Sequence, residues 1–256
     1  MKRIVCPVLA LSLLLSGCDM VKENLSVLFE SKMPQVEVEL PSETPVPAEA
    51  DYDIQRQDES IYDGSGELLV EYYYDLVQLT GDRPEVTSIN QSLEADSEVF
   101  FTSNGGRSEL KEMAFSMPDF GPYFNTAEAE VVQNGDDLFS IRMTTGWYMG
   151  GVVNYDCYGL TYRLDTGEKL DLADLTDQDL EVFGRQVRDA VKDYMEKHSE
   201  ISWWENAAQV VDEIPLEQMR FWVEDGEIVV SYATYDLAAG AYGAPIIPTG
   251  LTAKLT

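Results

Sequence analysis

Histidine and cysteine are scarce in this chain, and their scarcity excludes several kinds of site. His198 is the only histidine, and the three cysteines are Cys6, Cys18 and Cys157. Zinc sites built from several histidine or cysteine ligands are therefore excluded. A Cys157–His198 nucleophile pair is conceivable, but no catalytic motif surrounds either residue. His198 falls at the end of an expected helix, where a solvated side chain that interacts with the helix dipole is a simpler interpretation than a general base.

Basic residues are also few, with 17 Lys and Arg against 47 Asp and Glu, a net charge of −30. Nucleic acid is excluded as a partner because its phosphates would be repelled. Carboxylates are so abundant that no single pair of them points to a hydrolase. Two acidic stretches, 63–67 and 171–179, are similar to calcium loops but lack the EF-hand spacing. A solvated acidic surface is the expected role of these stretches, structural calcium is the alternative, and no cofactor is predicted.

A membrane-spanning helix needs about 20 apolar residues in a row, and the sequence has no apolar run of that length. Its N-terminus has Lys2 and Arg3, an apolar run over 4–15, and then Leu15-Ser16-Gly17-Cys18. This pattern predicts a secretory signal over 1–18. Its ending resembles the bacterial lipobox, in which the cysteine carries the lipid. We therefore expect a lipoprotein anchored to a membrane of the cell envelope through Cys18, rather than an uncleaved membrane anchor.

Residues 19–62 are predicted to be a disordered acidic tether. Prolines at 34, 41, 45 and 47 alternate with glutamates, and such a segment buries too little apolar surface to offset the entropy of ordering it. The folded domain is expected over 63–256. Lipidation of Cys18 and removal of Cys6 would leave no disulfide, so the domain depends on its core, in which Cys157 is expected to be a small buried residue.

The domain is predicted to have an α+β fold, a mostly antiparallel sheet with two main helices packed on it in the order β-α-β-β-β-α-β-β. Turn dipeptides at Asn134-Gly135 and Asp225-Gly226 are expected to join neighbouring strands. The second helix is expected to be capped by Thr176 or Asp177. Residues 103–125 are expected to be a loop. The expected strands are 68–76, 127–133, 138–146, 155–164, 219–223 and 228–232. The expected helices are 84–100 and a helix through 180–194.

Alternation within the expected strands predicts which side chains are buried. Tyr162 and Phe221 fall on faces that are expected to face the core. The bend after residue 146 carries Trp147, Tyr148 and Met149, with Tyr155 at the start of the next strand. These four residues either close the core at one end of the sheet or bind a partner, because aromatic and methionine side chains are enriched at interfaces.

Several motifs resemble one family of extracytoplasmic domains. They are Leu138-Phe139-Ser140-Ile141, the Tyr148…Gly150-Gly151 bend, and Tyr162 through Leu170 before an acidic helix start. The domain occurs in RsiV-type anti-sigma factors, which sense lysozyme, ahead of the catalytic domain of PdaC-type peptidoglycan deacetylases, and in surface lipoproteins. The resemblance covers roughly 65–250. Within the domain, 63–150 form an N-terminal part and 151–256 a C-terminal part that resembles the RsiV-type domain.

The resemblance implies a fold more directly than an activity. The family's bend usually reads Gly-Gly-Ala-His, whereas Val152-Val153 follow Gly150-Gly151 here, so no role of that histidine is carried over. The Asp and His ligand motifs of the deacetylase domain are absent from this sequence. An anti-sigma role is not expected, because it needs a sigma-binding domain and a transmembrane helix before the sensor domain.

Two functions follow as hypotheses. The first is a lipid-anchored, non-enzymatic binding or sensor-like domain for a cationic protein, such as a lysozyme-like partner, or for a cell-wall ligand. Its candidate contact residues are Trp147, Tyr148, Met149 and Tyr155, and its membrane contact is the lipid on Cys18. The alternative is a cell-wall-active hydrolase with paired carboxylates. The lack of any local catalytic motif favours the first.

Overall fold

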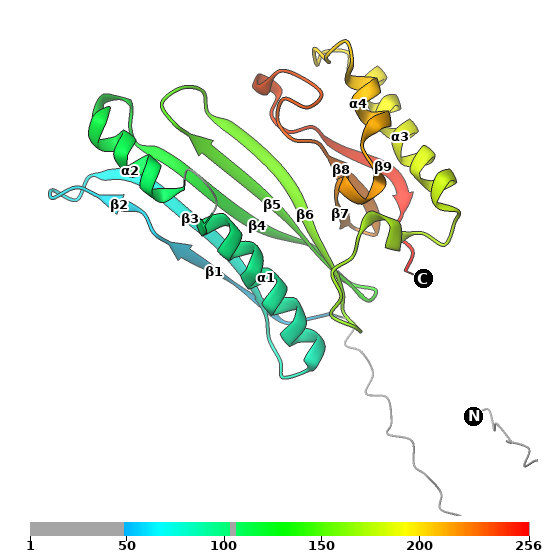
Figure 1. Ribbon diagram of the computed structural model, residues 1–256. Helices are drawn as coiled ribbons and strands as arrows, with labels where there is room; N and C mark the ends of the chain where they lie inside the picture. The colour runs from blue at the N-terminus through cyan, green and yellow to red at the C-terminus, as the bar shows by residue number, and fades with distance from the viewer. Residues whose placement is uncertain (1–48, 103–105, 256) are drawn as a thin grey trace, which may run out of the picture. The chain divides into compact units, whose positions relative to one another are not determined.

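Two β-sheets lie next to each other between two pairs of helices (Figure 1). The computed structural model describes residues 49–102 and 106–255. The predicted signal peptide with Cys18, and the tether as far as residue 48, lie outside the described residues. No helix in the described part of the chain is long and apolar enough to cross a membrane.

Sheet 1 has the order β1-β3-β4-β5-β6, with β2 beside β3. All neighbouring strands are antiparallel except β3 and β4, which are parallel because two helices connect them. The strands are β1 (Tyr52–Asp58), β2 (Ile61–Tyr62), β3 (Leu68–Leu79), β4 (Tyr123–Gly135), β5 (Leu138–Tyr148) and β6 (Asn154–Arg163). The connecting helices are α1 (Pro84–Thr102), α2 (Arg107–Ser116) and the short 3-10 helix η1 (Pro118–Phe120).

Helix α1 covers one face of sheet 1 because its apolar residues recur at helical spacing. Val86, Ile89 and Leu93 are buried on that face. Tyr162 lies in the same core and is 0% exposed, which confirms its predicted burial. The strand residues that complete this core include Tyr74, Leu76, Phe139, Ile141, Met143 and Leu160.

Sheet 2 has the order β7-β8-β9 and packs against α3 and α4 (Figure 1). Phe221 pairs with Val230 across the predicted Asp225-Gly226 turn, in which both residues have positive φ. This hairpin is confirmed, and Phe221 is buried as predicted. The elements are η2 (Leu172–Leu175), α3 (Leu180–Lys197), α4 (Ala207–Glu213), η3 (Leu216–Gln218), β7 (Arg220–Glu224), β8 (Glu227–Ser231), η4 (Gly240–Tyr242) and β9 (Ile246–Thr252).

The two sheets meet where β7 crosses β6. A Cβ atom on Gly159 would overlap the backbone carbonyl of Phe221, so only glycine permits this approach. Trp222, which is 0% exposed, fills the junction beside Cys157. The Ser231 hydroxyl donates a hydrogen bond to the Cys157 carbonyl at 2.9 Å. Cys157 is buried as predicted, and burial raises the pKa of its thiol to about 11, so the thiol stays protonated at neutral pH.

The predicted α+β class and mostly antiparallel pairing are confirmed, and several details differ from the sequence prediction. The strands divide into two sheets, each with its own helices, rather than forming one. Residues 52–62, assigned to the tether, form β1 and β2 and pair with β3. Residues 107–116, assigned to a loop, form α2.

The turn between β4 and β5 lies two residues beyond the predicted position. Asn134 and Gly135 still belong to β4, and Gly135 pairs with Leu138. Asp136 and Asp137 form the turn, with φ of 53° and 62°. Aspartate tolerates this left-handed conformation because its short side chain can form local hydrogen bonds. The Asn-Gly dipeptide was therefore a correct signal for a hairpin and a wrong one for the position of its turn.

Helix α3 is capped by Asp179 rather than by Thr176 or Asp177. The Asp179 carboxylate accepts hydrogen bonds from the backbone N–H groups of Glu181 at 3.0 Å and Val182 at 3.2 Å. These donors have no partner within the helix, so the carboxylate satisfies two groups that the helix leaves open.

Replacing this cap gives a first prediction. Asp179→Ala should lower the free energy of unfolding by about 1 kcal/mol, because the two N–H groups lose their acceptor. Asp177→Ala is the matched control, since Asp177 forms an exposed ion pair with the Lys254 ammonium at 3.3 Å and such pairs contribute little. Urea unfolding of both variants measures the difference. Equal losses from the two substitutions would show that Asp179 does not cap the helix.

Candidate functional site

The four candidate contact residues from the sequence lie near one end of sheet 1. Trp147 and Tyr148 end β5, Met149 follows in the bend, and Tyr155 lies near the start of β6. Trp147 pairs with Asn154 across the hairpin, so the bend is shorter than the sequence indicated and begins at Met149. Only two of the four, Trp147 and Met149, line the same described pocket.

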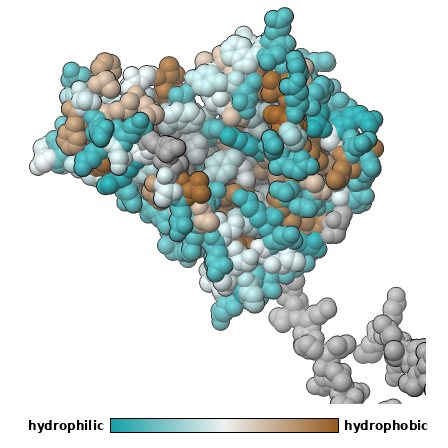
Figure 2. Space-filling view, in the orientation of Figure 1, coloured by the Kyte–Doolittle hydropathy of each residue, from teal (hydrophilic) through white to brown (hydrophobic). Residues whose placement is uncertain are grey.

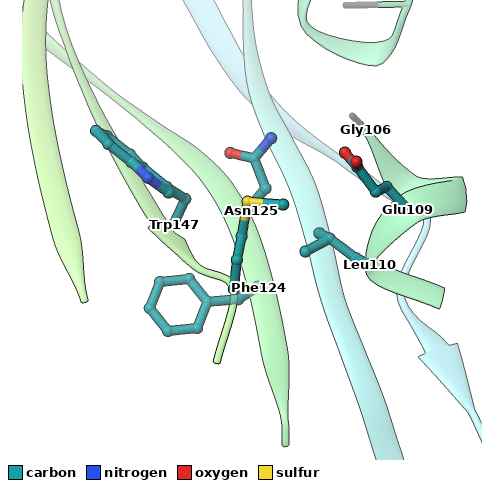
Figure 3. A pocket seen from close by; sticks show the side chains of 7 residues that line it. Gly106, Glu109, Leu110, Phe124, Asn125 and Trp147 are labelled. Carbon is teal, nitrogen blue, oxygen red and sulfur yellow. The ribbon is translucent and has the colours of Figure 1, made fainter. Parts of the chain in front are cut away.

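Trp147 and Met149 line a pocket of about 230 Å³, which we name the tip pocket. It lies between α2 on one side and β4 and β5 on the other (Figure 3). Figure 3 shows the Trp147 side chain across the pocket from Leu110 and Glu109, with Asn125 between them. Aromatic and aliphatic walls with one amide and one carboxylate are typical of small binding pockets.

Tyr148 and Tyr155 are not among the residues that line the tip pocket. The Tyr148 ring stacks against Tyr123 and Phe124, with centroids 5.9 and 6.0 Å away, so it closes the core at this end of the sheet. The Tyr155 ring lies across Gly146, where a Cβ atom would come within 3.1 Å of it. Tyr148 therefore closes the core at this end of the sheet, and Trp147 and Met149 remain predicted contact residues that line a pocket.

Exposed apolar residues lie in two segments beside the tip pocket, 115–120 and 149–153. Tyr123 contacts both segments, because its hydroxyl donates to the Met117 carbonyl at 2.8 Å and its ring lies against Gly150. Figure 2 shows brown and tan residues where Figure 1 draws α2 and the β5–β6 hairpin. The exposed apolar residues of these segments are Phe115, Met117, Phe120, Met149, Val152 and Val153. Clustered exposed apolar residues are a feature of interaction surfaces.

A second, larger hollow lies between α1 and strands β1 and β3, and we name it the acidic groove. Its volume is about 600 Å³. Leu76 and Phe101 give it apolar walls. Gln55, Gln57 and Gln78 add amide groups, and Asp58, Glu59, Glu94 and Glu98 add carboxylates. No lysine, arginine or histidine is among its described lining residues.

The charges of the acidic groove are largely uncompensated. Only Glu59 forms an ion pair with a described residue, with 3.5 Å between its carboxylate and the Arg107 guanidinium. Glu94 accepts one hydrogen bond, from the Gln78 amide at 3.4 Å. The hydroxyl and the backbone N–H of Ser60 lower the pKa of Asp58, so this carboxylate stays charged in more acidic solution than an ordinary one. A cation near the groove would meet several negative charges together.

The acidic groove was not predicted, because the residues of β1 were assigned to the tether. Two carboxylates and two amides of the groove come from residues 55–59, which become a wall only when β1 pairs with β3. The available signal was short: Tyr52 and Ile54 alternate with polar residues, as in a half-buried strand. It stood directly beside proline-rich sequence and gave no sign of its partner strand.

The acidic stretches and His198 have structural roles in the described chain. Asp63 accepts the backbone N–H groups of Ser65 and Glu67, both at 2.8 Å, and so closes a tight turn. Asp171 and Asp174 form a reciprocal cap on η2. His198 ends α3, as predicted, and its Nδ1 lies 2.8 Å from Glu200. Within 49–102 and 106–255, no three His, Cys, Asp or Glu side chains are grouped as metal ligands.

One carboxylate joins three elements of the core of sheet 1. The hydroxyls of Tyr74 and Tyr158 donate to the same oxygen of Asp96, at 2.7 and 2.8 Å. Burial raises the pKa of both phenols, so they remain protonated donors. Because the three residues come from β3, β6 and α1, this network holds the helix across the sheet.

Comparisons with known proteins give a likeness of fold. No protein-family model matches the chain, and no curated protein matches it. A DUF3298 family protein from Pseudomonas aeruginosa PAO1 has a similar structure, with a TM-score of 0.52 and 14% identity over 80% of this chain and 91% of that one. A DUF3298 member from Bacteroides fragilis gives a TM-score of 0.48 and 15% identity over 78% and 89%. The similarity to the Pseudomonas protein is a similarity of fold alone. At a coarse level, it is consistent with the extracytoplasmic domain family that the sequence motifs resemble.

Proposed function

We propose that this chain is a lipid-anchored protein of the bacterial cell envelope whose α+β domain binds a cationic partner without catalysing a reaction. The observation that carries the proposal is the acidic groove, a large hollow with four carboxylates and no basic residue in its described lining. The net charge of −30 also favours a cationic partner, because electrostatic attraction between oppositely charged proteins speeds their encounter.

The resemblance to lysozyme-sensing domains makes lysozyme, a strongly basic protein, one candidate partner. A basic protein attached to cell-wall glycan would present the same chemistry. The tip pocket would supply short-range contacts, since Trp147 and Met149 contribute apolar surface to its lining. Charge would then govern how fast the complex forms, and apolar contacts how slowly it separates.

Binding of lysozyme to the immobilised chain, measured by surface plasmon resonance, tests the proposal. The chain should bind at low ionic strength, and Trp147→Ala should speed dissociation while leaving association nearly unchanged. Tyr148→Phe is a suitable control, because it keeps the stacked ring at the same end of the sheet. Turnover of labelled peptidoglycan that a single Asp or Glu substitution abolishes would instead support the hydrolase.

The anchor part of the proposal rests on the lipobox pattern at Leu15-Ser16-Gly17-Cys18. Cys18→Ser should abolish acylation and leave unprocessed precursor, because the thiol that carries the lipid is lost. Incorporation of labelled palmitate in cells measures this, with Cys6→Ser as the matched control that should still be acylated. Palmitate on the Cys18→Ser protein would contradict the assignment of the lipid to this cysteine.

A further inference from the structure

Strand β1 leaves one edge of sheet 1 open in the described structure. It is the last strand in the sheet order, and all seven of its residues are exposed. The Asp51 carbonyl accepts from Thr80 and the Glu59 N–H donates to Tyr72, both at 2.8 Å. Backbone groups alternate in direction along an antiparallel strand. The N–H and C=O groups of Tyr52, Ile54, Arg56 and Asp58 therefore point away from β3.

The open edge runs beside the acidic groove. Gln55 and Gln57 of β1 line the groove, whereas the Arg56 side chain pairs with Asp75 on the opposite face of the sheet at 2.8 Å. A strand added along β1 would place every second side chain on the groove side of the sheet. Those side chains would face the region of Asp58, Glu94 and Glu98.

We infer that the partner inserts an extended basic segment that pairs with β1 as an additional strand. This inference rests on the proposed function and specifies how the groove binds. Main-chain hydrogen bonds to the outward groups of β1 would supply affinity, and alternate lysine or arginine side chains would select the groove carboxylates. Open edge strands are templates for such pairing.

Charge decides between the occupants that such an edge could take. The chain's own residues 19–48 contain six acidic and two basic residues, so this segment would be repelled by the groove. A second copy of the chain carries the same net charge of −30 and would be repelled too. An extended segment of a basic protein satisfies both the open backbone groups and the unpaired carboxylates.

Two peptides of equal charge separate strand pairing from simple charge attraction. One is a ten-residue peptide of alternating lysine and threonine, and the other is the same peptide with N-methyl groups on alternate backbone nitrogens. The full chain carrying Cys18→Ser is mixed with each at low ionic strength. The unmodified peptide should slow amide exchange at Tyr52, Ile54, Arg56 and Asp58 at least tenfold, and the methylated peptide should not.

A pair of variants tests the same bonds from the protein side. Ile54→Pro removes one outward N–H but none of the bonds to β3, and proline is tolerated in edge strands for this reason. It should weaken binding of the unmodified peptide about fivefold, as expected from the loss of one backbone hydrogen bond. Ile54→Ala removes the side chain, keeps the N–H, and should bind like the original chain.

The outcomes distinguish this inference from the proposed function. Equal, salt-sensitive binding of the two peptides would overturn strand pairing and leave a cationic partner in place. The same holds if Ile54→Pro and Ile54→Ala bind equally well. Lack of binding by both peptides and by lysozyme at low ionic strength would overturn the proposed function as well. A dimer of the chain that competes with the peptide would assign the open edge to a second copy.

Discussion

Replacing Trp222 by alanine is expected to lower the free energy of unfolding by about 3–5 kcal/mol. This indole is 0% exposed and lies between the two sheets, beside Cys157 and Val229. Its removal would leave a cavity between sheet 1 and sheet 2, and the surrounding strands cannot close it without moving a whole sheet. Urea or thermal unfolding, followed by circular dichroism, measures the loss.

Trp204→Ala is the matched control for this prediction, because Trp204 is 43% exposed. Trp204→Ala should lower the free energy of unfolding much less than Trp222→Ala, because the Trp204 side chain buries less apolar surface on folding. Gly159→Ala should also destabilise the fold strongly, because its methyl group would overlap the Phe221 carbonyl. Equal losses for Trp222→Ala and Trp204→Ala would mean that the sheets do not depend on the indole at their junction.

Neutralising the acidic groove should have the largest effect on binding. The triple variant Asp58→Asn, Glu94→Gln and Glu98→Gln should lower the association rate with lysozyme at least tenfold at low ionic strength, because steering by a charged cleft contributes about 10–10³-fold. Stopped-flow fluorescence measures this rate. Stability should change little, because none of the three carboxylates forms an ion pair with a described residue.

A control variant with the same loss of charge separates the groove from the overall field. Glu181→Gln, Asp189→Asn and Glu196→Gln change exposed residues of α3, which packs on sheet 2 rather than sheet 1. This variant should keep most of the association rate. If both variants lower the rate equally, net charge rather than the groove steers the partner.

Local patterns predicted the elements whose signals are contained within a few residues. Asp225-Gly226 adopts positive φ at both positions, so the β7–β8 hairpin was correctly placed. Phe183, Val187 and Val191 recur at helical spacing and are buried on α3. The alternation around Tyr162 identified one buried face of β6. It did not reveal that Thr161 on the other face is also buried. On that face Trp222 and Val229 of sheet 2 pack beside Cys157.

Features that depend on distant pairing could not be predicted. Strand β1 has no exposed-to-buried alternation, since all of its residues are exposed and only its backbone pairing with β3 makes it a strand. The acidic groove and the open edge depend on that pairing. Of the four predicted contact residues, Trp147 and Met149 meet in the tip pocket because α2 lies opposite them, and α2 was assigned to a loop.

The association rate of the original chain with lysozyme, measured at two ionic strengths, tests most directly whether the domain recognises a cationic partner by charge. The screening length is about 30 Å at about 0.01 M salt and about 8 Å at about 0.15 M salt. We predict that the association rate falls at least tenfold between these conditions while the dissociation rate changes much less. An association rate independent of salt, or no binding at the lower ionic strength, would contradict recognition through the acidic groove.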